Sequence, residues 1–185
     1  MEKKFDIVIC GVGGQGILLC SDIIGTAGII EGLEVKGSEI HGMSQRGGSV
    51  DAHIRLNCKF GPRIPHGEAD LIIGLEPLET ARNLFYLKSD GIVVTNSFKI
   101  PLVGKDYDEK EIIDFIKSKI KNTYVENFTQ IAQKIGSIKV LNILMLGYAS
   151  KFIPLKKESF YKAIEYNVKK EFLKVNLSAF NYFNK

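Results

Sequence analysis

The sequence opens with a short apolar run that passes through a glycine-rich turn into a longer apolar segment with helical spacing. The run is FDIVIC (5–10), the turn is GVGGQG (11–16), and the segment that follows is GILLCSDIIGTAGIIEG (16–32). A strand that enters a helix through Gly-x-Gly-x-x-Gly is typical of the first unit of a nucleotide-binding α/β fold. This feature predicts that the chain begins with a buried strand and a helix that packs on it.

Apolar runs continue to alternate with helical patterns along the chain. Further strands are expected at 34–39, 49–57, 69–77, 91–97 and 124–128, and further helices at 77–87, 108–120, 128–148 and 156–183. Strands that alternate with helices predict an α/β fold with a Rossmann-like, doubly wound, mostly parallel sheet. We therefore expect a single domain over 1–185, with its core in about 1–127 and a helical C-terminal part in about 128–185.

Composition limits the class of protein. The chain has 185 residues, 45% hydrophobic and 25% charged, which suits one globular domain with a sizeable core. Its net charge of +4 comes mostly from a Lys-rich C-terminal third, which argues against nucleic-acid binding. The apolar start is too short for a signal peptide, and no apolar stretch reaches membrane-spanning length. We expect a soluble, cytoplasmic protein without a membrane partner.

The cysteines Cys10, Cys20 and Cys58 stand far apart in the sequence. Neither a disulfide framework nor a Cys-x-x-Cys metal or cluster site can be built from this spacing. Cys10 and Cys20 lie in apolar segments and are expected in the core. The sequence therefore predicts a reducing compartment, no iron–sulfur cluster in this chain and no metal site.

The glycine turn is the first candidate binding site. Gly11 would permit a tight turn, Gly13 would let a ligand approach the backbone, and Gly16 would let helix and strand pack closely. Free amides and the dipole at the start of the helix favour an anion such as phosphate. The alternative is a turn that serves packing alone.

An NAD-binding fold also needs an acidic residue near the end of its second strand, about twenty residues beyond the glycines. Here Lys36 and Gly37 occupy the expected strand end, and Glu39 lies slightly later. The dinucleotide fingerprint is thus incomplete, which argues against a self-sufficient dehydrogenase.

A polar loop, IHGMSQRGGSV (40–50), follows the second expected strand. Arg46 suits an anion, because its guanidinium can donate paired hydrogen bonds to phosphate or carboxylate. It could equally pair with an acid of this chain or of a partner. His41 could carry a proton or could hold the loop backbone through hydrogen bonds.

Polar residues also stand at two later strand ends. Glu76, before Pro77, could reach a ligand or cap the helix that Pro77 starts. Asn96 and Ser97 carry the same two interpretations. The lysines and aromatic residues near the C-terminus could cover the sheet, dock a large subunit or form a solvated face.

Two stretches together carry a family resemblance, GVGGQGILLCSDIIGTAG and GSEIHGMSQRGGSVDAHIRL. They resemble the gamma-type domain of the 2-oxoacid:ferredoxin oxidoreductases, and within that family the small (beta) subunits of the indolepyruvate type. The resemblance is strongest over 5–56. The runs ADLIIGLEPLETAR and GIVVTNS suit it.

This resemblance implies an enzyme that decarboxylates indolepyruvate or another aryl 2-oxoacid, forms an acyl-CoA and reduces ferredoxin. The chain has neither clustered cysteines nor a Gly-Asp-Gly…Asn-Asn motif. Thiamine diphosphate, magnesium and iron–sulfur clusters would therefore belong to a large partner subunit, and this chain would be inactive alone.

In this interpretation the glycine turn and the polar loop contact coenzyme A or close against the partner. The expected binding residues are Gly11, Gly13, Gly14, Gln15, Gly16, Gln45, Arg46, Gly47 and Gly48; His41 and Arg46 are candidates for catalysis. Two other function classes stay open, a stand-alone NAD- or FAD-binding oxidoreductase and a non-catalytic interaction module.

Overall fold

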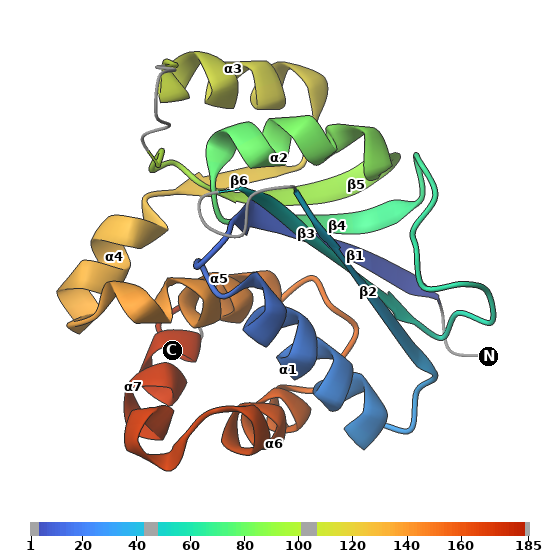
Figure 1. Cartoon of the computed structure of the whole chain (residues 1–185), viewed down its shortest axis with the longest axis vertical. Helices are drawn as coiled ribbons and strands as arrows, with labels where there is room; N and C mark the ends of the chain where they lie inside the picture. The colour runs from blue at the N-terminus through green and yellow to red at the C-terminus, as the bar shows by residue number, and fades with distance from the viewer. Residues whose placement is uncertain (1–3, 43–47, 101–106, 184–185) are drawn as a thin grey trace.

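The computed structural model (Figure 1) describes residues 4–42, 48–100 and 107–183 of the chain. Its strands are β1 (Phe5–Val12), β2 (Val35–His41), β3 (Ser49–Leu56), β4 (Ala69–Gly74), β5 (Leu87–Asn96) and β6 (Thr123–Glu126). Its helices are α1 (Ile17–Ile30), α2 (Pro77–Asn83), α3 (Glu109–Lys119), α4 (Phe128–Ile135), α5 (Leu141–Ala149), α6 (Lys157–Asn167) and α7 (Lys170–Phe180). Short 3-10 turns, η1 (Leu84–Tyr86) and η2 (Ile138–Val140), follow α2 and precede α5.

The strands form one sheet in the order β2-β3-β1-β4-β5-β6. The pairs β1/β4, β4/β5 and β5/β6 are parallel, which confirms the predicted mostly parallel sheet. The difference is β3, which lies antiparallel between β2 and β1. The reason is the short connection from β2 to β3: a few residues can join antiparallel neighbours, whereas parallel ones need a crossover of about a dozen residues.

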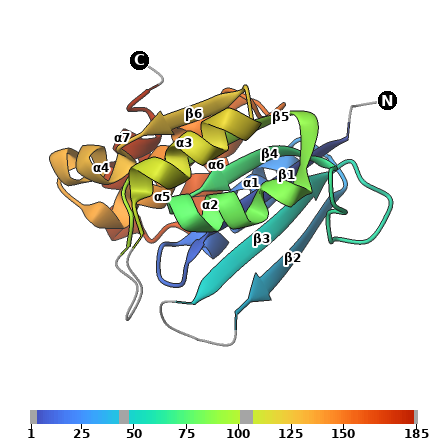
Figure 2. The same cartoon turned by 90° about the horizontal axis from the view of Figure 1, so that it is seen from above.

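Helices cover both faces of the sheet (Figures 1 and 2). One face carries α1 and α5, with α6 and α7 packed behind them, and the other carries α2 and α3. A hydrophobic cluster lies on each face of the sheet, and alternate residues of β1 pack into one or the other. Ile7 and Ile9 face the α1 side, and Val8 and Cys10 face the α2 side. This alternation is the period of a strand that is buried on both faces.

Two predicted helices are each divided in the structure. The helix expected over 128–148 breaks at Gly136, which ends α4 in the left-handed region with φ 112°. The helix expected over 156–183 breaks at Val168 and Lys169, both extended or nearly so, into α6 and α7. A glycine in this conformation is a common helix stop.

Helix α5 is buried on all sides, as its apolar sequence predicted. The sheet lies on one side of it and α7 on the other. Gly147 allows this close approach, because a Cβ there would lie 2.2 Å from the carbonyl oxygen of Phe180. The helical C-terminal part thus packs on the same core as β1 and α1.

Candidate functional site

The glycine turn and the two described ends of the polar loop meet at the carboxyl edge of the sheet. The amide of Gly13 donates to the carbonyl of Gly48 at 2.9 Å, and the amide of Gly42 donates to the carbonyl of Ser49 at 2.8 Å. This edge is where α/β folds bind ligands. The predicted residues Gln45, Arg46 and Gly47 lie outside the described residues, and so does the side chain of His41.

Gln15 holds the turn in place. Its Oε1 accepts from the amide of Val12 at 2.7 Å, and its Nε2 donates to the carbonyl of Leu75 at 3.1 Å. A Cβ on Gly11 would lie 2.5 Å from this Oε1, so Gly11 leaves room for the Gln15 side chain. Gly11 itself is part of β1, rather than of the turn as predicted. Both polar ends of Gln15 are therefore engaged inside the protein.

Within the turn, the glycines in left-handed conformation are Gly14 (φ 98°) and Gly16 (φ 80°). A Cβ on Gly14 would meet nothing within 4 Å, so the turn is open there. A Cβ on Gly16 would lie 2.4 Å from Nδ2 of Asn142, the second residue of α5. Gly16 therefore lets α5 approach the start of α1, whereas the sequence predicted that it lets the first helix pack closely on the first strand.

The start of α1 carries no side-chain cap. Gly16 is the N-cap residue and makes no side-chain hydrogen bond, so the first amides of the helix have no partner of that kind. Such amides and the positive end of the helix dipole favour hydrogen-bond acceptors.

A cavity of about 370 Å³ lies beside this turn. Its walls come from the turn, from the chain after β5 and from the segments around η2; they are Gly14, Gln15, Gly16, Leu19, Phe98, Ile100, Thr129, Ile138, Lys139, Leu141 and Asn142. Lys139 is the one charged side chain among the described walls. Sequence reasoning missed the wall from α4 to α5, because no local signal links Asn142 to a turn 126 residues earlier.

Two of the three polar strand-end residues, Glu76 and Asn96, make side-chain hydrogen bonds that hold this edge together. Glu76 is 2% exposed and caps α2, because its Oε2 accepts from the amide of Glu79 at 2.9 Å. Its carboxylate also accepts from the hydroxyl of Tyr107, and burial raises its pKa. Asn96 is fully buried and its Nδ2 donates to Leu75 and Thr129.

Ser97 continues the same edge through its backbone. Its amide donates to the carbonyl of Glu126 at 2.9 Å, which extends the pairing of β5 with β6. Of the two roles predicted for Glu76, ligand contact or helix capping, the structure shows helix capping. Asn96 and Ser97 join neighbouring strand ends.

The three cysteines are buried, as expected for Cys10 and Cys20. Burial raises the pKa of Cys10 well above its ordinary value and that of Cys20 to about 12. Both thiols therefore stay protonated and unreactive at neutral pH. Over the described residues no group of three or more His, Cys, Asp and Glu side chains is placed to hold a metal ion.

A pair formed by the buried His53 and the partly exposed Asp51, which the sequence did not signal, lies in β3. Nδ1 of His53 accepts from the amide of Ile64 at 3.1 Å, and Nε2 lies 3.2 Å from Asp51 Oδ2. Because the amide of Ile64 donates to the buried ring, this pair fixes the loop that follows β3.

The position of β3 also bears on whether this fold could bind NAD. In a dinucleotide fold the second strand lies next to the first, and its end holds the ribose. Here β2 is separated from β1 by β3, so the strand end beside β1 at this edge is the start of β3, with Ser49. This strand order is a further argument against a stand-alone NAD-binding oxidoreductase.

In the described residues, no helix is both long and apolar enough to cross a membrane.

The family described as pyruvate ferredoxin/flavodoxin oxidoreductase matches residues 6–182. Indolepyruvate oxidoreductase subunit IorB of Methanothermobacter thermautotrophicus is 39% identical, over 96% of this chain and 94% of that protein. The common gamma subunit of the pyruvate/ketoisovalerate oxidoreductases of Pyrococcus abyssi is 31% identical, over 84% of this chain and 82% of its own.

A solved structure shares the fold. The 2-oxoglutarate:ferredoxin oxidoreductase of Magnetococcus marinus, with 2-oxoglutarate, coenzyme A and succinyl-CoA bound, superposes with a TM-score of 0.76 at 21% identity. The match covers 100% of this chain and 31% of that one, so the same fold there is part of a longer chain.

Proposed function

The chain belongs to the pyruvate ferredoxin/flavodoxin oxidoreductase family, and from that membership we propose that it is the small subunit of an indolepyruvate:ferredoxin oxidoreductase. The observation that carries the substrate class is the contrast between two relatives. Identity to the indolepyruvate subunit is 39% over 96% of the chain, against 31% over 84% for the pyruvate/ketoisovalerate subunit. The reaction would be the oxidative decarboxylation of an aryl 2-oxoacid to an acyl-CoA.

The cysteines support a division of labour between subunits. Cys10, Cys20 and Cys58 are all buried and stand far apart in the sequence, which supports iron–sulfur ligation by a large partner subunit rather than by this chain. Thiamine diphosphate with magnesium and the clusters, all held by that partner, would supply decarboxylation and electron transfer to ferredoxin. The small subunit would supply a binding edge beside that centre.

Coenzyme A is the ligand that we propose for this edge. The open face of Gly14, the uncapped start of α1 and the adjoining cavity with Lys139 support contact with an elongated anionic substrate. The likeness to the Magnetococcus structure establishes the shared fold alone, so this proposal rests on the geometry of the edge. We also propose that Gln45, Arg46, Gly47 and Gly48 of the polar loop contact coenzyme A or the partner.

The test is co-expression with a thiamine-diphosphate subunit of the same family. The purified complex should reduce ferredoxin in a coenzyme A-dependent reaction, with kcat/KM for indolepyruvate at least about tenfold above that for pyruvate or 2-oxoisovalerate, a difference of about 1.4 kcal/mol. The small subunit alone should give no ferredoxin reduction. A preference for pyruvate, or activity of the isolated chain, would contradict the proposal.

A further inference from the structure

A further cavity lies between α1, the turn η2 and the connection from α6 to α7. Its volume is about 360 Å³, close to the lower end of the range of about 300–1,000 Å³ that is usual for small-molecule sites. Most of its wall is apolar, formed by Leu19, Val140, Val168, Phe172 and Val175. The ring of Phe172 is 50% exposed, so an apolar group bound in this cavity would remove it from water.

The cavity exists because α6 and α7 do not form one continuous helix. Val168 is extended and Lys169 has a ψ of 141°, so the chain leaves α6 and begins α7 in a new direction. The side chain of Asn167 fixes this end of α6 against α1, because its Nδ2 donates to Oγ1 of Thr26 at 3.0 Å. The walls are therefore held in place by contacts within the protein, before any ligand binds.

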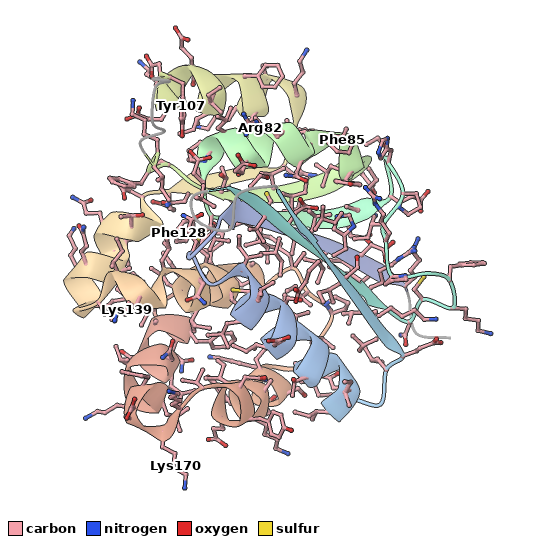
Figure 3. All side chains as sticks on the ribbon, in the orientation of Figure 1. Arg82, Phe85, Tyr107, Phe128, Lys139 and Lys170 are labelled. Carbon is pink, nitrogen blue, oxygen red and sulfur yellow. The ribbon has the colours of Figure 1, made fainter. Side chains whose placement is uncertain are left out.

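The charged groups of this cavity are both cations. Lys139 and Lys169 are exposed, and neither forms an ion pair with another described residue. Figure 3 shows Lys139 at the surface beside α4. The hydroxyl oxygen of Ser137 accepts from the amide of Lys139 at 3.2 Å, and within the described residues its hydrogen has no acceptor. No Asp or Glu is among the described walls, so this end of the cavity offers donors and positive charge to an anion.

These two properties select the chemistry of the ligand. The apolar walls favour a ligand with an apolar body, because burial removes both apolar surfaces from water. The ammonium and hydroxyl groups favour an anionic acceptor such as a carboxylate. A ligand that carried charge along its whole length would lose hydration against the apolar walls without a partner there. The cavity is also too small for a ligand with several rings and phosphates, so it suits a small amphipathic anion.

We propose that this cavity binds a small carboxylate with an apolar body, whose carboxylate lies near Ser137, Lys139 and Lys169 and whose body lies against Phe172. The inference goes beyond the proposed function, because such a ligand would contact residues of this chain alone. Leu19 and Lys139 also line the cavity beside the glycine turn, whereas Lys169 and Phe172 are not among the described walls of that cavity. Substitutions of Lys169 and Phe172 therefore test this site separately.

The experiment titrates the isotope-labelled full-length chain with small probes and follows the backbone amides by NMR. The probes are phenylacetate, hexanoate, acetate, and phenylacetamide as the uncharged counterpart of phenylacetate. Phenylacetate and hexanoate should bind saturably, with shifts centred on 137–140 and 167–176. Phenylacetate should bind about fivefold more tightly than phenylacetamide, the factor expected for ion pairing at an exposed site. Acetate should bind at least about tenfold more weakly, because it lacks the apolar body.

Lys169→Gln and its matched control Lys174→Gln remove the same charge. Lys174 is an exposed residue of α7 that is not among the described walls of the cavity. In Lys169→Gln the preference for phenylacetate over phenylacetamide should fall to about twofold, and in Lys174→Gln it should stay at the wild-type value. Phe172→Ala should weaken both probes about tenfold and leave their ratio unchanged, because it removes apolar wall but no charge.

Several results would overturn the inference. They are no saturable binding of phenylacetate or hexanoate up to about 10 mM, equal binding of phenylacetate and phenylacetamide, and shifts centred on the glycine turn at 13–16. If the probes failed to bind and Lys169→Gln weakened assembly with the large subunit, the cavity would instead be a contact with that partner. Ferredoxin reduction by the complex tests the proposed function and does not depend on any of these results.

Discussion

At Gly16 the backbone turns into α1 in a left-handed conformation, directly beneath the side chain of Asn142. Its neighbour Gly14 has a similar positive φ but open space around it. Substitutions at these two glycines therefore distinguish two contributions to the loss of stability that usually occur together. One is the cost of placing an L-residue in the left-handed region, and the other is the cost of collision with a packed neighbour.

We expect Gly14→Ala to lower the free energy of unfolding by about 1–2 kcal/mol, the cost of its backbone conformation. Gly16→Ala should cost about 1–3 kcal/mol more, because the new Cβ must also displace Asn142 from the start of α1. Urea denaturation of the full-length chain, followed by circular dichroism, measures both. Equal losses for the two variants would show that the contact between Gly16 and α5 does not limit stability.

At the scale of elements, α2 begins with a buried carboxylate. Glu76 caps its first turn next to Pro77 and lies close to Glu79. Burial, with the nearby charge of Glu79 acting in the same direction, raises the pKa of Glu76. The folded state therefore holds this proton to higher pH than the unfolded chain does, and stability falls as pH rises from the ordinary glutamate value of about 4.3 to the raised folded value.

Glu76→Gln should remove this dependence, because an amide oxygen can still accept from Glu79 but does not ionise. Relative to wild type, the variant should gain stability as pH rises from about 4 to 8. Free energies of unfolding measured for both proteins across this pH range test whether the difference grows with pH. Glu171→Gln, at an exposed first-turn position of α7, controls for the change in net charge. A gain that grows toward low pH would contradict the burial argument.

At the scale of the whole molecule, the sheet and the C-terminal helices share one core. The same cluster of buried residues includes Ile9 of β1, Ile24 of α1, Met145 of α5 and Phe180 of α7. Neither the predicted core over 1–127 nor the helical part over 128–185 can bury its apolar face without the other.

We therefore expect the full chain to unfold in one cooperative transition, with coincident near- and far-ultraviolet circular dichroism curves in urea. A chain ending at residue 127 should lack a cooperative transition, because removing α5 exposes the face of the sheet that it covers. Cooperative unfolding of that shorter chain would show that the sheet part is an independent domain.

Much of this fold could be predicted because its signals are local. Buried strands, helical spacing and turn residues lie within a few positions of one another, so the order of strands and helices was readable. The glycine turn was recognisable from GVGGQG and its neighbours alone. The limits of the helices were less predictable, since Gly136 and Val168 divide two patterns that read as continuous.

The sequence by itself determined the fold class, the family resemblance and the two segments that meet at the carboxyl edge. The tertiary structure alone decided how β3 enters the sheet and what surrounds the glycine turn. The sequence could not show that Gln15 holds the turn in place, because this role depends on its hydrogen bond to Leu75. Asn142 lies at the site only because α5 packs on the start of α1. Contacts between residues so far apart in the chain depend on how the whole core packs, which no local pattern encodes.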